Sequence, residues 1–320
     1  MVKAQESRKT MQTGVRKIRI DGDVAGQRID NFLMTALPGV PRSRIYRLLR
    51  RGEVRVNGGR VRAEYRLGPG DEVRIPPARV SISGSAPPDE AQQMLDRVIY
   101  EDKRLLVLDK PSGVAVHGGS GVSHGAVELL RDSRDDLRRL SLVHRLDRDT
   151  SGCLVLAKRK SALRELHEKF RQRVVEKNYL ALVAGDWQRG DYLIDAPLIT
   201  QHRKNRERYV IVSGEGVRAR TRVRLSRTFG RFSLLQCQPL TGRTHQIRVH
   251  AQYMGHPLVI DQRYGEPQAN LEAEELGLSR LFLHAQSISF PDESGNELHF
   301  TAPLADDLDQ FLARLNGAGH

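Results

Sequence analysis

The sequence predicts an α+β protein of two unequal domains, and three observations support this fold class. The chain has 320 residues, 39% of them hydrophobic, which is enough for one large core and a smaller one. Near its N-terminus, two amphipathic helical patterns precede a tight-turn signal. After residue 94, segments typical of strands outnumber helical segments. We therefore expect a larger domain built on a mixed, mainly antiparallel β-sheet with a central cleft.

The first domain is expected over residues 18–80, after a basic stretch, residues 1–17, that we expect to be a disordered leader. AGQRIDNFLMTAL and SRIYRLLRRG each repeat apolar residues at the spacing of one helix face. EVRVNGGRV then places Asn57-Gly58 between alternating valines, which predicts a hairpin turn, and LGPGDEVRI adds a strand. The order is therefore two helices followed by short strands.

Positive charge is concentrated in this first domain. Lys and Arg number 52 against 39 Asp and Glu, a formal net charge of +13, and the segment 42–66 holds nine arginines but only two acids. A solvated basic face is the alternative, but the planar guanidinium suits RNA because it binds phosphate in a bidentate manner and stacks on bases. The candidate RNA-binding residues are Arg44, Arg47, Arg50, Arg51 and Arg55.

Residues 81–93, SISGSAPPDEAQQ, have no periodicity and are expected to form a linker. The two cysteines, Cys153 and Cys237, lack CxxC spacing, which fits a reducing compartment, and we expect a cytoplasmic protein. No apolar run approaches the roughly 18 residues of a membrane span. Nothing in the sequence indicates an obligate protein partner.

The larger domain is expected over residues 94–320. RVIYEDKRLLVLDKPSGVAVH predicts two strands joined by a turn, and SALRELHEKFRQR predicts a helix. KNYLALVAG, TRVRLSR and FSLLQCQPL predict further strands. GRTHQIRVHAQYMG predicts a helix that packs through Ile247, Val249 and Ala251, and LFLHAQSISF returns to a strand.

One carboxylate lies in an unusual setting, in LVHRLDRDTSGCLVLAK. Apolar residues on both sides place Asp147 in a loop between packed segments, and neighbouring arginines favour its ionised form. Such a group can act as a nucleophile or a base. The alternative is that Asp147 caps the turn at Thr150-Ser151-Gly152.

Two other chemistries fit fragments of the sequence. HRLDRD is similar to the HRD catalytic loop of protein kinases, but Leu146 intervenes, no DFG follows, and GGSGVSHG lacks the glycine patterns that bind nucleotide phosphates. A metal-dependent phosphodiesterase would need recurrent ligand spacing, whereas the histidines lie beside Gly, Arg and Pro without one. We therefore expect no metal and no cofactor.

HRLDRDTSG resembles the catalytic motif HRLDxxTSG of the RluA-type pseudouridine synthases. Four further segments resemble the other conserved blocks of this family, in the same order: DKPSGVAVHGGSG, KNYLALVAG, TGRTHQIRVH and GHPLVIDQRYG. The resemblance covers roughly residues 94–305, and residues 25–76 resemble an S4 (αL-type) RNA-binding domain. The chain is thus identified as a member of this family with an N-terminal S4 domain.

The resemblance implies an isomerase that converts uridine in RNA to pseudouridine without a cofactor or metal. Asp147 would act as nucleophile or base on a flipped-out uridine, at C1′, at C6 or through a glycal route, alternatives that stay open. Tyr179 would lie under the base, and Arg243 would pair with Asp147 at the floor of the cleft. Ile247 would pack on the base pocket.

By the same resemblance, Arg145 would fill the space that the flipped base leaves, the alternative being an ion pair with Asp149. Lys110 and His117 would support the loop that carries them. The implied partner is 23S ribosomal RNA or a large-subunit assembly intermediate. The second function class is an RNA-binding or ribosome-assembly protein with an inactive synthase domain.

Overall fold

A computed structural model shows two compact units, residues 1–85 and 86–320. The structure describes residues 10–317 apart from 13, 23, 38–39, 41, 78, 82–85, 119–123 and 203–207. Within these residues, no helix combines the length and apolar character that a membrane crossing requires.

The first unit packs two helices against a three-stranded antiparallel sheet. The helices are α1 (Ile29–Ala36) and α2 (Arg42–Arg51), and the sheet has the order β2 (Arg16–Arg19), β4 (Glu72–Ile75), β3 (Arg55–Val56). The apolar face of α2 is buried, as its spacing predicts, and Asn57 and Gly58 both have positive φ values, as a primed hairpin turn requires.

Two expected boundaries of this region are wrong. Strands β1 (Thr10–Gln12) and β2 begin inside the expected leader. Their partners, β5 (Arg79–Ser81) and β4, lie more than 50 residues further on, so no local pattern predicts the pairing. The expected linker over 81–93 contains most of α3 (Pro88–Leu95), which begins with a proline and two acids and buries Ala91 and Met94. Residues 1–9 and 82–85 lie outside the described residues.

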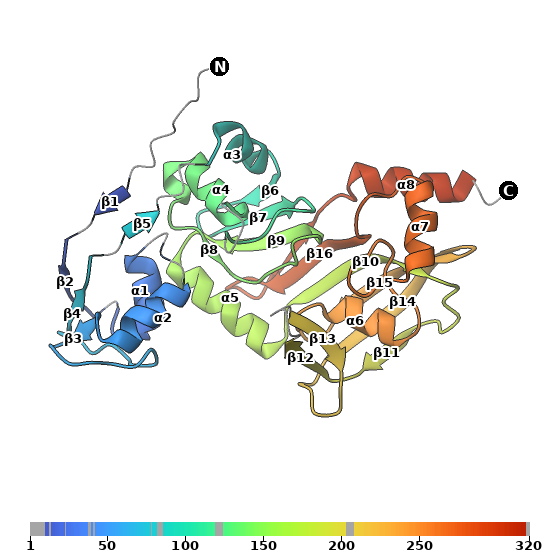
Figure 1. Cartoon of the computed structure of the whole chain (residues 1–320). Coiled ribbons are helices and arrows are strands. Elements are labelled where there is room, and N and C mark those ends of the chain that lie inside the picture. Colours follow the sequence, from blue (N-terminus) through green and yellow to red (C-terminus); the bar gives the residue numbers. More distant parts are fainter. Residues whose placement is uncertain are drawn as a thin grey trace, which may run out of the picture. The chain divides into compact units, whose positions relative to one another are not determined.

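The second unit is built on a ten-stranded sheet (Figure 1). Its main order is β11-β14-β15-β10-β16-β9-β7-β6, with β17 paired to β16 and β8 paired to β9. The bounds are β6 (Val98–Glu101), β7 (Leu105–Lys110), β8 (Ser141–Leu142), β9 (Ser151–Ala157), β10 (Glu176–Ala184), β11 (Tyr192–Asp195), β14 (Arg220–Phe229), β15 (Phe232–Pro239), β16 (Leu283–Pro291) and β17 (Glu297–Thr301). A separate hairpin consists of β12 (Leu198–His202) and β13 (Arg208–Val212).

Helices cover both faces of this sheet. On one face of β7 and β9 lie α3 and α4 (Ala126–Ser133), and on the other face lies α5 (Lys160–Gln172). All seven residues of β9 are therefore buried, which explains its unbroken apolar run. Around β10 and β15, α6 (Gln246–Tyr253) packs on one face, and α7 (Pro267–Glu275) with α8 (Asp306–Gly317) packs on the other.

A short parallel pairing joins the two halves of the sheet. Strands β9 and β16 pair only through Ser151 with His284 and Gly152 with Ala285, whereas the other pairings between described strands are antiparallel. Gly152 has φ 105°, and a Cβ atom there would lie 2.2 Å from the carbonyl oxygen of Ala285. Only glycine fits this position. The α+β prediction with a mainly antiparallel larger sheet is confirmed.

Candidate active site

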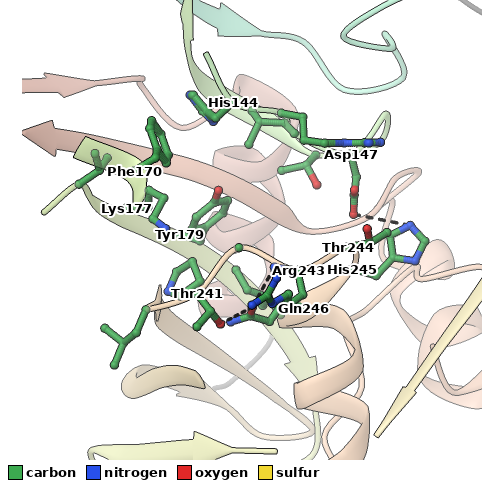
Figure 2. Close-up of a pocket in the computed structure, with 18 of the residues that line it drawn as sticks. His144, Asp147, Phe170, Lys177, Tyr179, Thr241, Arg243, Thr244, His245 and Gln246 are labelled. Atoms are coloured by element: carbon green, nitrogen blue, oxygen red, sulfur yellow. Dashed lines mark hydrogen bonds and ion pairs between the residues drawn. The ribbon is translucent and has the colours of Figure 1, made fainter. Parts of the chain in front are cut away.

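A cavity of about 600 Å³ opens where the two halves of the sheet meet (Figure 2). The loop between β8 and β9 and the C-terminal end of α5 form one wall, and β10, the loop after β15 and the start of α6 form the other. Five residues predicted from the sequence line this one cavity: Arg145, Asp147, Tyr179, Arg243 and Ile247.

The charge on the cavity wall is strongly asymmetric. Asp147 is the one carboxylate among the described residues that line the cavity. Six lining residues are Lys or Arg: Arg145, Arg171, Arg173, Lys177, Arg243 and Arg248. A concave wall with this composition attracts a polyanion and holds a single anionic side chain inside the same space.

The other residues of the HRLDRDTSG motif hold the loop in place. His144 accepts a hydrogen bond at Nε2 from the backbone N–H of Val155 (3.0 Å), and its ring stacks on Phe170 (Figure 2). Burial lowers the pKa of His144 to about 3, so this histidine is neutral and anchors the loop. Leu146 points into the core under α4.

Asp149 pairs with Arg148, whose Nε lies 3.0 Å from Oδ1, rather than with Arg145. Arg145 is exposed, and its guanidinium has no hydrogen-bond or ion-pair partner among the residues that the structure describes. The alternative interpretation of Arg145, an ion pair with Asp149, is therefore wrong. The Arg145 side chain is available to a ligand in the cavity.

Lys110 supports the same loop from below. Its buried amine donates to the carbonyl oxygens of Pro111, Val114 and Arg148 at 2.7–2.9 Å. Burial lowers the pKa of Lys110 to about 7, against the opposing charges of Asp149 and Asp147. His117 binds Glu128 at 3.2 Å, at the start of α4. The hydrogen bond from Lys110 to the carbonyl oxygen of Arg148 fixes the backbone next to Asp147.

The arginine that faces Asp147 is Arg248, not Arg243. Nη1 of Arg248 lies 3.6 Å from Oδ2 of Asp147, whereas Arg243 is exposed and donates from Nε to the carbonyl oxygen of Arg218 (3.3 Å). The expected Arg243–Asp147 pair is therefore wrong within the described residues. Arg243 precedes α6, and Arg248 lies on the buried helix, which brings only the latter to the floor of the cavity.

Arg248 is held in this position by Asp261. Its Nε and Nη2 each lie 2.7 Å from a carboxylate oxygen of Asp261, which also accepts from the backbone N–H groups of Arg263 and Tyr264. Burial alone would raise the pKa of Asp261, but these donors outweigh it and hold the pKa below its usual value. The preceding Ile260 has φ 56°, a strained value for a β-branched residue.

Strand β10 carries two polar side chains into the cavity, Lys177 and Tyr179 (Figure 2). Burial and the negative charge of Asp147 raise the pKa of Tyr179 well above its usual value, so the phenol stays protonated. Burial lowers the pKa of Lys177 to about 8. Its amine lies 5.9 Å from the centre of the Phe170 ring.

Gln246 fastens the loop that leads into α6. Its side-chain oxygen accepts from Thr241 Oγ1 (2.7 Å) and from the backbone N–H of Arg243 (3.0 Å). Its amide nitrogen donates to the carbonyl oxygen of Arg220 and to Thr221 Oγ1, both at 2.9 Å. Gln246 thus holds this loop in place through four hydrogen bonds, a role that the sequence did not predict.

The candidate arginines of the first unit are mostly exposed. Arg47 and Arg50 are exposed with no side-chain partner in the described part of the chain, and Arg51 approaches Glu53 at 3.9 Å. Arg55 donates to the carbonyl oxygens of Gly52 and Gly58. Arg44 is only half-exposed, and its Nε is buried without a partner. Arg47 and Arg50 are therefore the most accessible of the set.

No cluster of three or more His, Cys, Asp or Glu side chains is placed to hold a metal ion within the described residues. The buried histidines are occupied by hydrogen bonds to backbone and hydroxyl groups.

Comparison with protein families gives two matches. The family described as RNA pseudouridylate synthase matches residues 104–253, and the S4 domain family matches residues 27–73. The chain is 49% identical over 317 residues to the ribosomal large subunit pseudouridine synthase C of Escherichia coli (strain K12), covering 97% of this chain and 99% of the relative. The protein of the same name from Pasteurella multocida (strain Pm70) is 48% identical over 316 residues, covering 97% of each chain.

Two solved human structures share the fold of the larger unit. Human RNA pseudouridylate synthase domain containing 4 aligns with a TM-score of 0.60 and 25% identity, covering 71% of this chain and 95% of that one. Human RNA pseudouridylate synthase domain containing 1 aligns with a TM-score of 0.54 and 26% identity, covering 68% and 94%.

Proposed function

This chain belongs to the family of RNA pseudouridine synthases and is therefore an isomerase, and we propose that it converts specific uridines of 23S ribosomal RNA to pseudouridine with Asp147 as its catalytic carboxylate. The names of its relatives, ribosomal large subunit pseudouridine synthase C, support this choice of substrate. The proposed partner is the RNA itself or a large-subunit assembly intermediate, and the place of action is the cytoplasm.

One observation carries this proposal: Asp147 is the single carboxylate among the described lining residues of a cavity that six cationic side chains also line. The cations suit the phosphates of RNA, and the carboxylate lies where a base pushed into the cavity would meet it. The interpretation of Asp147 as a mere turn cap does not account for its side chain, whose contacts are with Arg248 and His245 across the cavity.

The reaction needs no other reactant. The bond between C1′ and N1 of uridine breaks, a bond between C1′ and C5 forms, N1 gains a proton and C5 loses one. An ionised carboxylate can attack C1′ or C6 or act as a base in a glycal route, and each route begins from the same anion. Arg248 supports this step by placing a fixed positive charge 3.6 Å from Oδ2 of Asp147.

The remaining residues serve the flipped base. Removing a base from its stack costs a few kcal/mol. Arg145 is exposed, has no partner among the described residues and lies two positions before Asp147, so it is suited to occupy the vacated space. Tyr179 lines the same cavity as Asp147, on the opposite wall, and, being protonated, offers its ring and a hydroxyl donor to the base. Ile247 is buried beneath the same cavity and provides an apolar floor.

The test is to map pseudouridine across large-subunit rRNA in a deletion strain, complemented with wild type or with Asp147→Asn. The amide keeps the shape of the side chain but removes its charge, so we expect the missing sites to return with wild type only, and the variant to show below about one per cent of wild-type activity. An unchanged pattern in the deletion strain would instead favour the RNA-binding or assembly function.

A further inference from the structure

His245 lies in the cavity wall with its ring between Tyr264 and Asp147. Its Nδ1 is 2.9 Å from the hydroxyl oxygen of Tyr264, and its Nε2 is 3.9 Å from Oδ2 of Asp147 (Figure 2). The residue has φ 54°, in the left-handed region that disfavours most side chains, and it directly precedes α6. The fold therefore holds this ring next to the carboxylate at some conformational cost.

The hydrogen bonds of Tyr264 decide which ring nitrogen carries the proton. The buried hydroxyl already accepts from the backbone N–H of Val210 (3.1 Å), and its single proton has one acceptor among the described residues, Nδ1 of His245. If Nδ1 donated instead, the hydroxyl proton would be buried without an acceptor, and the lone pair of Nε2 would face the carboxylate of Asp147. Both effects favour the tautomer with hydrogen on Nε2.

The two donors that face Asp147 converge on the same atom. The nearest approaches of both residues are to Oδ2, at 3.6 Å from Arg248 Nη1 and 3.9 Å from His245 Nε2, and Oδ1 accepts no hydrogen bond from the described residues. Both distances exceed those of hydrogen bonds, but catalytic contacts often tighten when substrate binds. The two oxygens of the carboxylate are therefore not equivalent.

We propose that Tyr264 fixes His245 as its Nε2–H tautomer, and that His245 is a positioning residue that, with Arg248, retains Oδ2 of Asp147 so that Oδ1 meets the substrate. The catalytic part of this inference rests on the proposed role of Asp147, whereas the tautomer does not.

The charge state of His245 agrees with this arrangement. Burial lowers the pKa of His245, the negative charges of Asp147 and Asp261 oppose this shift, and the positive charges of Arg248 and Arg263 reinforce it. The net direction is downward, so the ring is neutral at neutral pH and has one N–H to place.

The tautomer is tested by two-dimensional NMR of the imidazole nitrogens in the full chain labelled with ¹⁵N-histidine, with the His245 signal assigned by its loss in His245→Asn. The protein supplies internal references. His250 and His284 face carbonyl oxygens with Nε2, and His256 faces one with Nδ1, so their tautomers follow from geometry. We expect His245 to group with His250 and His284. A signal that groups with His256 would overturn the proposal.

The positioning role is tested by Tyr264→Phe in steady-state reactions on an unmodified transcript of large-subunit rRNA. Without the hydroxyl, both tautomers become accessible, so we expect the His245 signal to shift toward a mixture and kcat to fall at least about tenfold, with KM within about twofold. Tyr253→Phe, the same change at an exposed tyrosine outside the cavity, should leave kcat unchanged. An unchanged kcat in Tyr264→Phe would refute the positioning role.

A second pair of variants separates positioning from folding. Asparagine tolerates a positive φ, but in His245→Asn the side chain is too short to reach Asp147. In His245→Gln the longer side chain brings an N–H donor toward the position of Nε2, but glutamine is disfavoured at a positive φ. We expect His245→Asn to be the more stable variant and His245→Gln to have the higher kcat. If one of the two variants had both the higher stability and the higher kcat, the proposal would be contradicted. If Asp147→Asn retained full activity, the proposed function would fail while the tautomer result would stand.

Discussion

Arg248 reaches Asp147 with one nitrogen, Nη1 at 3.6 Å, and the other two nitrogens of its guanidinium are bound elsewhere. Nε and Nη2 belong to a buried, bidentate pair with Asp261. The orientation of the cation at the floor of the cavity is thus set by a carboxylate that does not line the cavity itself. A substitution at Asp261 should therefore change the catalytic rate through Arg248, although Asp261 itself does not contact the substrate.

We expect Asp261→Asn to lower kcat at least tenfold and to destabilise the fold by about 3–5 kcal/mol, because it leaves a buried guanidinium without its counter-ion. Urea unfolding and steady-state activity assays measure the two effects. Asp307→Asn is the matched control, since Asp307 also binds an arginine, Arg280, through both oxygens but is exposed. It should cost about 1 kcal/mol or less. Equal losses in both variants would argue against a special role for Asp261.

Arg173 ends α5 with φ 62°, where glycine is preferred, and its exposed side chain lines the cavity. Arg173→Gly and Arg173→Gln both remove the charge, but only glycine relieves the backbone. We expect the glycine variant to be more stable than the glutamine variant by about 1 kcal/mol, while both bind RNA more weakly than wild type. Arg164→Gln, on the same helix but outside the cavity, is the binding control. If either Arg173 variant bound RNA as tightly as wild type, the Arg173 side chain would have no part in binding.

Lys177 should make stability depend on pH in a defined direction. Burial lowers its pKa from 10.5 to about 8, so below pH 8 the folded state holds a buried charge at a cost. Between about pH 8 and 10.5 the unfolded chain binds more protons than the folded one, and stability from this group rises with pH. Lys177→Met should therefore be more stable than wild type at pH 7, and this advantage should shrink at pH 10.

Urea unfolding at the two pH values measures this difference, with the exposed Lys160→Met as the control that should show none. Lys177→Met should also bind RNA more weakly at pH 7, because one cavity cation is lost. A stability advantage that is equal at pH 7 and pH 10 would contradict the buried charge.

The exposed arginines of α2 should determine part of the salt dependence of RNA binding. The slope of log affinity against log salt concentration is negative. If Arg47 and Arg50 each contact one phosphate, changing both to glutamine should reduce the magnitude of this slope by roughly 1.4–1.8. The measurement is a titration against a large-subunit rRNA fragment at several salt concentrations. Arg139→Gln, an exposed arginine of the second unit, is the control. An unchanged slope in the double variant would mean that these side chains face solvent in the complex.

Local patterns in the sequence predicted the elements whose residues lie close together in the chain. Helix α5, the Asn57-Gly58 turn and the loop that carries Asp147 each depend on neighbours within a few positions. The motif resemblance added Tyr179, which lies in the same cavity as Asp147 although a helix separates them in the sequence.

The position of Arg248 could not be predicted in this way. The pattern of GRTHQIRVHAQYMG suggests a helix with one packed side, whereas the first six residues of α6 are all buried. Arg248, which lies outside the packed side predicted from Ile247, Val249 and Ala251, is in fact turned toward Asp261 and the cavity, a relationship fixed by tertiary packing. In the sequence, the one available signal is an arginine inside an apolar helical pattern, followed thirteen residues later by an aspartate before a turn. Strands β1 and β2 were missed for a similar reason, because their partners lie far along the chain.

The short parallel pairing between β9 and β16 limits when the active site can form during synthesis of the chain. Asp147 belongs to the half of the sheet that contains β9, and Tyr179 and Arg248 belong to the other half. The strand that joins these halves, β16, pairs His284 with Ser151, 133 residues earlier. A ribosome must therefore translate well past the HRLDRDTSG motif before the two walls of the cavity can be held together. The cavity that contains Asp147 can therefore be completed only after β16 has been synthesised.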